Sequence, residues 1–366
     1  MSTVVSKSIR SRVSVNIDTV EFSLRGMEFV IPGAKNVTLR DPHGHKIMEY
    51  GNRVPMKGKF DAHNIHVRTK ESGRVLEFEG SLFAFLHGQN IYTSDNLSQA
   101  CRKVIKRVMV IFKLKPPEEL QQQWFAGDIS LQRIDLAVNF LLRSESEVVG
   151  VLKQIRRQLV EQHGVTRTCG TSVYWAPRDG VKYSISFYAK GAQMRRSKKY
   201  VKLPGHDVLL KECENILRME VRLRASELRE LGLDQVGAWK EGTAEKVFRK
   251  YMGKLKLLSV TRGPISDEEL EMIPDRMRPV YALHKAGVAL DKLYSTRSCQ
   301  RHVSTFKQLG IDLRCPNQPI DAIKSLKRFL SPKKVINDAP EWMKDAGIVP
   351  PRAVISTKSQ AVKVRN

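Results

Sequence analysis

The chain has 366 residues, with 63 lysines and arginines against 38 aspartates and glutamates, and a formal net charge of +25. It contains no apolar run long enough to cross a bilayer, and residues 1–12 lack the apolar segment of a secretory signal. Its five cysteines show no CxxC spacing, which argues against zinc sites and disulfide frameworks and is typical of a reducing cytoplasm. A cysteine-poor chain this basic predicts a polyanionic partner, of which nucleic acid is the usual one.

Changes in composition divide the chain into four segments. We expect a flexible basic tail at 1–12, a sheet-containing domain at 13–232, a helical region at 233–345 and a disordered basic tail at 346–366. In the helical region, Thr243 is placed to cap a helix over 244–258. The stretch 294–309 is rich in arginine and histidine. It suits a small helix-turn-helix-like DNA-binding unit, and it suits a solvated helix equally well.

Three stretches alternate between apolar and polar residues with the period of a β-strand: 129–142, 182–190 and 216–224. Their polar faces carry Asp135, Tyr188 and Glu220. Three arginines share those faces: Arg133, Arg218 and Arg222. These residues are typical of a catalytic phosphate site, and they are also typical of an ion-pair ladder on an exposed sheet face.

Amphipathic helices are expected on both sides of the first of these strands. One helix would begin at Ser94 or Asp95, and Ser144 with Glu147 forms a capping box for another. Such helices can cover the apolar side of the strands. The expected fold class is therefore α+β, with a mostly antiparallel sheet, helices on one face, an exposed polar face that would be catalytic, and a smaller helical C-terminal region.

The stretch before these strands is rich in turns and histidines. Four histidines lie within residues 32–66, namely His43, His45, His63 and His66. Their short spacing resembles that of metal ligands, but side chains on loops lack the fixed geometry of a metal site. We therefore assign no metal to them, and we expect a mixed turn over residues 81–92.

Tyr188 stands at the end of its strand, on the polar face, with Lys190 two residues further on. A basic run follows, which includes Arg195, Arg196, Lys198 and Lys199. A tyrosine beside a phosphate-binding surface can attack a phosphodiester and hold the 5′ end covalently. The alternative is a structural tyrosine at a strand end with a hydrogen-bonded hydroxyl.

Four ordered motifs resemble the filamentous-phage gene II replication initiator family. They are His87-Gly-Gln-Asn90, Arg133-Ile-Asp135, Phe187-Tyr188-Ala-Lys190 and Arg218-Met-Glu220-Val-Arg222. Further similarity at 298–311 and 339–342 extends the resemblance over roughly residues 15–345. The first motif departs from the family, which often shows Gly-His-Asn, because here the histidine precedes the glycine.

The resemblance implies a rolling-circle initiator fold and activity. Such proteins nick one strand of double-stranded origin DNA through a tyrosyl-5′-phosphate intermediate, and later reclose the displaced strand. Carried over by motif, Tyr188 would be the nucleophile, with Lys190 as its helper. Asp135 and Glu220 would be ligands of Mg²⁺ or Mn²⁺, with His87 as a third ligand.

The same resemblance implies partners and a place of action. Double-stranded origin DNA, single-stranded DNA, and a host helicase and polymerase would be partners, in the cytoplasm of a bacterial host. The expected DNA contacts are Arg133, Arg218, Arg222, Arg195, Arg196, Lys198, Lys199, Arg297 and Arg301. The alternative function is a non-catalytic basic DNA-binding protein, such as a phage repressor or a replication accessory protein.

Overall fold

The computed structural model describes most of the chain between residues 13 and 350. The described ranges are 13–32, 34–61, 63–160, 164–177, 182–197, 202–255, 270–271, 273–286, 288, 290–309, 313 and 326–350. The predicted tail at 1–12, Lys198, Lys199 and residues 351–366 lie outside these ranges. Within them, no helix is both long and apolar enough to cross a membrane.

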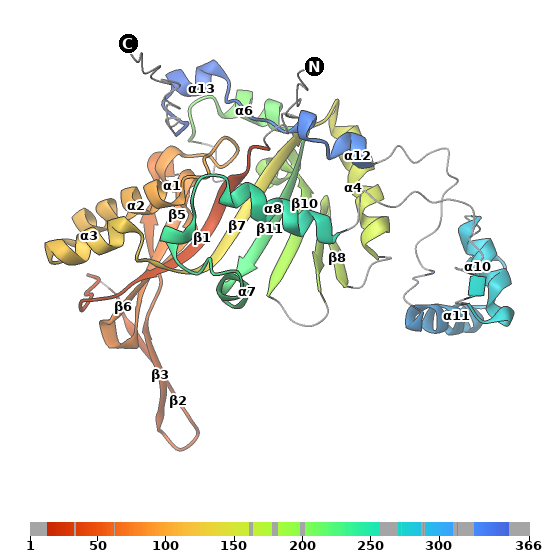
Figure 1. The fold of residues 1–366 in the computed structure, drawn as a ribbon, viewed down its shortest axis with the longest axis horizontal. Coiled ribbons are helices and arrows are strands. Elements are labelled where there is room, and N and C mark those ends of the chain that lie inside the picture. The colour runs from red at the N-terminus through yellow and green to blue at the C-terminus, as the bar shows by residue number, and fades with distance from the viewer. Residues whose placement is uncertain are drawn as a thin grey trace, which may run out of the picture.

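One antiparallel sheet dominates the described part of the chain (Figure 1). Its strands are β1 (Asn16–Leu24), β2 (Asn36–Arg40), β3 (Lys46–Gly51), β4 (Val54–Lys57), β5 (Asn64–Lys70), β6 (Val75–Ser81), β7 (Ser130–Leu141), β8 (Val165–Cys169), β9 (Ser172–Ala176), β10 (Tyr183–Ala189) and β11 (Ile216–Arg224). The spatial order is β2-β3-β5-β6-β1-β7-β11-β10-β9-β8, and β4 pairs with β5 beside this path. The predicted α+β class with a mostly antiparallel sheet is confirmed.

Helices pack around this sheet and lie in the C-terminal part of the chain. They are α1 (Leu82–His87), α2 (Leu97–Phe112), α3 (Glu118–Ala126), α4 (Glu145–Val160), α5 (Lys190–Arg196), α6 (His206–Cys213), α7 (Ala225–Glu230), α8 (Thr243–Lys254), α10 (Arg278–Lys285), α11 (Thr296–Gln308), α12 (Leu326–Phe329) and α13 (Glu341–Asp345).

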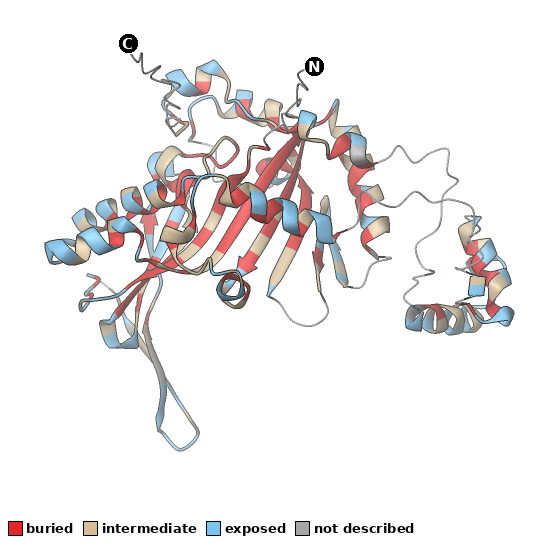
Figure 2. Cartoon of the chain, viewed as in Figure 1, coloured by how far each residue is buried: buried red, intermediate tan, exposed pale blue. Residues whose placement is uncertain are grey.

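The main hydrophobic core lies between the apolar face of the sheet and helices α2, α4 and α8 (Figure 2). Alternation along β7, β10 and β11 sends every second side chain into this core, as the period of a strand requires. Phe22 of β1 stacks on Phe78 of β6, with ring centroids 4.5 Å apart. Tyr183 of β10 meets Tyr251 of α8 edge to face, with centroids 4.7 Å apart.

Several local predictions need correction. Asn96, not Ser94 or Asp95, caps α2, because its side chain accepts from the backbone N–H of Gln99. The N-cap of α8 is Gly242, so Thr243 does not cap it. Residues 82–87 form a helical turn rather than a mixed turn, and α3 and β8 were not expected. The capping box is confirmed, because Ser144 Oγ accepts from the backbone N–H of Glu147.

The C-terminal residues do not form one separate helical unit. Helix α8 and the stretch 326–335 pack into the main core, and α13 packs with α6 in a second cluster. Helices α10 and α11 lie apart from the sheet in Figure 1 and share a third cluster of their own. The predicted tail at 346–366 begins too early, because Ile348 is fully buried. The helix-turn-helix interpretation of α10 and α11 stays a prediction.

The stacked pair of Phe22 and Phe78 provides a test of the core. We expect Phe22→Ala to lower the free energy of unfolding by about 3–5 kcal/mol, because it leaves a cavity between β1 and β6. Urea unfolding followed by circular dichroism measures this loss. The control Val110→Ala removes apolar atoms from a side chain that is 78% exposed on α2, and should change stability by less than about 0.5 kcal/mol. Equal effects of the two changes would contradict this core assignment.

Candidate active site

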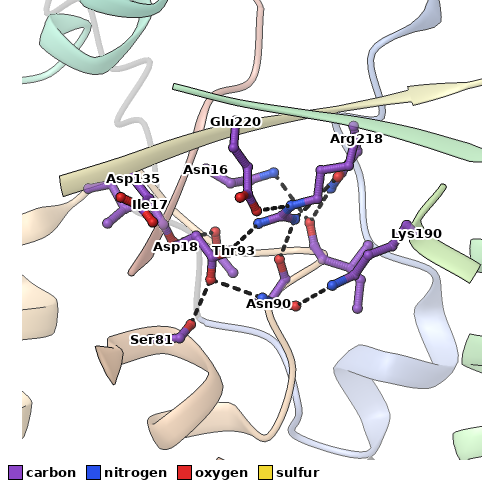
Figure 3. Close-up of polar contacts among 12 residues, drawn as sticks. Asn16, Ile17, Asp18, Ser81, Asn90, Thr93, Asp135, Lys190, Arg218 and Glu220 are labelled. Carbon is purple, nitrogen blue, oxygen red and sulfur yellow. Dashed lines mark hydrogen bonds and ion pairs between the residues drawn. The ribbon is translucent and has the colours of Figure 1, made fainter. Parts of the chain in front are cut away.

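Arg218 is the buried charge around which the polar face of the sheet is assembled. Its side chain on β11 has 0% exposed surface. Its guanidinium donates to Asp18 Oδ2 and to Glu220 Oε1, both at 2.9 Å (Figure 3). It also donates to the backbone oxygen of Asn90 at 2.8 Å and to Asn139 Oδ1 at 3.2 Å. These partners satisfy a charge that would otherwise be costly to bury.

Asp18 of β1 is the second centre of the same network. Besides Arg218, it accepts hydrogen bonds at Oδ1 from Ser81 Oγ and from the side-chain amide of Asn90, both at 2.9 Å. Burial would raise the pKa of Asp18, but Arg218 and Lys190 outweigh this effect and lower it. Asp18 therefore stays ionised and compensates the charge of Arg218.

The loop at residues 88–96, between α1 and α2, is fastened to the polar face by buried amides. Asn16 and Asn139 donate to the backbone oxygen of Ile91 at 3.3 Å and 2.8 Å. The side-chain oxygen of Gln89 accepts from the backbone N–H of Ile91, and its nitrogen donates to the backbone oxygen of Ile348 at 2.9 Å. Gln89 thus acts as a structural clamp. The polar face is consequently covered in part, and is less exposed than predicted.

Tyr188 of β10 reaches the same network from the neighbouring strand. Its hydroxyl donates to Glu220 Oε1 at 2.6 Å, the oxygen that Arg218 also contacts. The register explains this proximity, since Tyr188 pairs with Arg218 and Ser186 pairs with Glu220. The hydrogen-bonded hydroxyl expected of a structural tyrosine is present. Tyr188 and Glu220 also line a cavity, as a reacting pair would have to.

The pKa shifts follow from this burial. Burial raises the pKa of Tyr188 well above its usual value, and the charge of Glu220 adds to the rise. Burial also raises the pKa of Glu220, against the opposing charge of Arg218 and with support from Asp18 and Asp135. Glu220 therefore has an enhanced affinity for a proton and holds the hydroxyl that would have to lose one.

Lys190 supports the site from below. Its side chain is fully buried, and Nζ donates to Asn90 Oδ1 and Gln193 Oε1, both at 2.9 Å. Asn90 and Gln193 line the cavity, and Lys190 does not. Burial, reinforced by the charge of Arg218, lowers the pKa of Lys190 to about 8. These contacts favour a positioning role over the direct catalytic role predicted for it.

Asp135 of β7 lies two positions along the same face and is held by two arginines. Arg133 donates from its guanidinium to both carboxylate oxygens, at 3.0 Å and 2.6 Å. Arg222 of β11 lies directly opposite Asp135 and donates to Oδ2 at 3.0 Å. Asp135 is 2% exposed, so the alternative of an ion-pair ladder describes its contacts correctly.

A cavity of about 510 Å³ lies over this face. Tyr188, Glu220 and Asp135 line it on the side of the central strands, and His66 and Glu79 line it on the side of β5 and β6. The sequence analysis brought the first three together correctly. It placed His63 and His66 in a turn-rich stretch, whereas His66 lies on β5 and both line this cavity.

His87 does not line the cavity. It ends α1, and burial, together with Lys103 and Lys59, lowers its pKa to about 4. Its predicted place beside Asp135 and Glu220 is therefore wrong. The reason is that α1 ends at Gly88, whose left-handed backbone (φ +85°) turns the chain before Gln89 and Asn90 enter the site.

The predicted DNA contacts fall into three groups. Arg218 has no exposed surface and cannot reach DNA, so this prediction is wrong. Arg222 and Arg133 are partly exposed beside the cavity, and Arg195 pairs with Glu145 and Glu214. The remaining described arginines are exposed: Arg196, Arg297 and Arg301.

The predicted metal ligands do not assemble into a metal site. Both oxygens of Asp135 contact arginines, and one oxygen of Glu220 is shared by Arg218 and Tyr188. Nowhere in the described ranges are three or more His, Cys, Asp and Glu side chains grouped to hold a metal ion. The arginines supply the positive charge that a cation would bring to these carboxylates.

The comparison with known families decides the identity of this sheet. Residues 17–242 match the family described as the N-terminal part of the phage gene II replication-associated protein, and this range contains Asp18, Asp135, Tyr188, Arg218 and Glu220. The chain belongs to this family. It is also 26% identical over 249 residues to the replication-associated protein of the same type from Enterobacteria phage I2-2, which covers 67% of this chain and 72% of that protein. The predicted family is confirmed, and the chain is a phage replication-associated protein of the gene II type.

The family match ends before α10 and α11, so it concerns the sheet and its polar face. Two residues of that face, Asp18 and Asn139, were not singled out by sequence. The alternation of Asn16-Ile-Asp18 in the first predicted strand was the available signal for Asp18. No local pattern reveals that Asn90 closes the network, because its partners are distant along the chain.

Arg218 gives the sharpest test of this network. We expect Arg218→Met to lower the free energy of unfolding by about 3–5 kcal/mol, because it leaves Asp18 and Glu220 buried without their counter-charge. Urea unfolding measures the loss, and adding Asp18→Asn should recover part of it. The control Arg249→Met breaks an exposed pair with Glu245 and should cost less than about 1 kcal/mol. A stable Arg218→Met protein would refute the network.

Proposed function

We propose that this protein is a rolling-circle replication initiator that nicks one strand of double-stranded origin DNA and later recloses the displaced strand. The observation that carries the proposal is the hydrogen bond from the Tyr188 hydroxyl to Glu220 at the wall of the 510 Å³ cavity. A nucleophile, a proton acceptor and room for a substrate thus coincide within the region matched by the family.

The chemical step follows from these groups. Tyr188 Oη attacks the phosphorus of one phosphodiester and loses its proton to Glu220. The bond from phosphorus to the 3′ oxygen breaks, the 3′ oxygen leaves as a hydroxyl once protonated, and the 5′ phosphate stays on Tyr188. Attack by a 3′ hydroxyl on this phosphotyrosine reverses the step and closes a strand. The linkage preserves the phosphodiester, so no nucleotide cofactor is needed.

Arginines at the cavity supply charge for the phosphate. Arg222 has a side chain that is 37% exposed, and its contact with Asp135 aims it along the cavity face. Arg53 is 47% exposed, pairs with Glu79 and lines the opposite side. Fixed positive groups of this kind stabilise the charge that develops on a transferring phosphoryl group. The net charge of +25 adds attraction for the DNA backbone.

A need for Mg²⁺ or Mn²⁺ stays a prediction, to be tested by chelation. We further propose that the free 3′ hydroxyl is extended by a host polymerase, behind a host helicase, in the bacterial cytoplasm. These partners follow from the proposed reaction and have no contact surface assigned to them.

Tyr188→Phe tests the nucleophile. The parent, incubated with supercoiled plasmid carrying the phage origin and Mg²⁺ or Mn²⁺, should give nicked circles with protein covalently attached. Tyr188→Phe should bind the same DNA and give no covalent product, because phenylalanine has no attacking oxygen. Denaturing gels with and without protease measure both outcomes, and a parallel series with chelator tests the metal.

Tyr251→Phe is the matched control, because the Tyr251 hydroxyl also donates to a buried glutamate, Glu227, but lies on the apolar face outside the cavity. It should nick as the parent does. A covalent product from Tyr188→Phe would refute Tyr188 as the nucleophile. Tight origin binding without any nick by the parent would instead favour a DNA-binding regulator.

Glu220→Gln tests the proton acceptor. We expect nicking to fall by about 10²- to 10⁴-fold, because glutamine cannot take the proton of Tyr188. In the parent, nicking should fall as the pH drops, since protonation of Glu220 removes the acceptor. The raised pKa of Glu220 places the midpoint above the ordinary glutamate value of about 4.3.

Single-turnover rates across this pH range measure the effect. Glu227→Gln alters the corresponding buried pair with Tyr251 and should leave both rate and midpoint unchanged. A Glu220→Gln variant with the parental rate would exclude Glu220 as the acceptor.

A further inference from the structure

Tyr174 is the exception among the aromatic side chains of this protein. Among the described Phe, Tyr and Trp residues, it is the exposed one, at 47%, and all others are buried or half-buried. It does not lie on a remote surface, because it lines the cavity that contains Tyr188 and Glu220. An exposed aromatic ring at a polar cavity has to be explained by something other than packing in the core.

The register of the sheet places Tyr174 in a defined row. Arg167 of β8 lies directly opposite Tyr174 of β9, which lies opposite Ser186 of β10, which lies opposite Glu220 of β11. Directly opposed residues share a face of the sheet, so all four side chains belong to the polar face. The row runs from the exposed Arg167 at the edge strand to Glu220, whose side chain is 14% exposed.

The same register sets the distance to the proposed nucleophile. Tyr188 lies opposite Ser172, two residues before Tyr174, so the two tyrosines are diagonal neighbours. Diagonal neighbours in an antiparallel pair are about 7–8 Å apart. This is the scale of one step along a nucleic acid strand. A base resting on Tyr174 would therefore leave the adjoining phosphate close to Tyr188.

Charge at the edge of the sheet suits the backbone of the same strand. Arg167 is exposed beside Tyr174, and the guanidinium of Arg196 lies 3.0 Å from where a Cβ on Gly170 would stand, in the turn that joins β8 to β9. An aromatic platform next to basic side chains is the combination that binds single-stranded nucleic acid without sequence preference.

We propose that Tyr174 is a base-stacking platform that receives a nucleobase of the unpaired DNA strand and so presents the neighbouring phosphate to Tyr188. The idea rests on the proposed nicking function for its biological meaning. The stacking itself needs only single-stranded DNA and no cleavage.

Binding of two probes by the full-length protein tests it. One is a dT oligonucleotide of about 12 residues, within the range of single-strand site sizes, and the other is an abasic strand of equal length and charge. All variants carry Tyr188→Phe, so that no cleavage interferes. This parent should prefer the dT probe, and Tyr174→Ala should weaken dT binding by about 5- to 150-fold while leaving abasic binding unchanged. Tyr174→Phe should keep the preference, since its ring still stacks.

Three results would overturn the proposal. They are an unchanged dT affinity in Tyr174→Ala, no preference for bases in the parent, and a loss in Tyr174→Phe equal to that in Tyr174→Ala, which would assign a role to the hydroxyl instead. The control Leu141→Ala changes a side chain that is 46% exposed on β7 and outside the cavity, and should bind both probes as the parent does. The plasmid assay on protein with Tyr188 intact reports separately on nicking, so a failure of the proposed function is distinguishable from a failure of stacking.

Discussion

The structure depends on the neutralisation of one buried guanidinium. Arg218 sits in the middle of the sheet, where solvation by water is not available, so its charge must be met by protein groups. Asp18, Asn90 and Glu220 meet it from a neighbouring part of the sheet, a loop and its own strand. The position of each is thereby determined by the same cation. The register of the central strands and the course of the 88–96 loop follow from this requirement.

This arrangement also explains how a polar cluster can exist beside a hydrophobic core. A strand has two faces, and the alternation along β11 gives the core Leu217, Met219 and Val221 while the opposite face carries Arg218 and Glu220. The core makes the strands rigid, and the network on the other face is rigid because its donors and acceptors are paired. Tyr188 is thus presented by a stiff support, which is what an in-line displacement requires of a nucleophile.

Much of this could be predicted from local sequence, because the period of a strand is a local property. The alternation over 129–142, 182–190 and 216–224 correctly placed Asp135, Tyr188 and Glu220 on one side of one sheet. Burial could not be predicted in this way. Arg218 looks like any surface arginine in its strand, and only the 88–96 loop and β1, folding over it from afar, remove it from solvent.

The errors have the same origin. Helix α1 spans six residues, too few for a helical period to be recognised. His87 was placed in the site because its motif was aligned with the family, but the chain turns at Gly88 and brings in Gln89 and Asn90 instead. Short elements and turns are decided by what they pack against, and that information lies elsewhere in the chain.

The clamp made by Gln89 has a consequence for the order in which the protein is completed. Gln89 is separated from Ile348, whose backbone oxygen it binds, by 259 positions. A ribosome adds roughly 5–20 residues per second, so the loop waits on the order of ten seconds or more for this partner. During that interval the sheet can form while the loop over its polar face lacks its final contact. The shape of the cavity is therefore completed by residues that are synthesised long after those that line it.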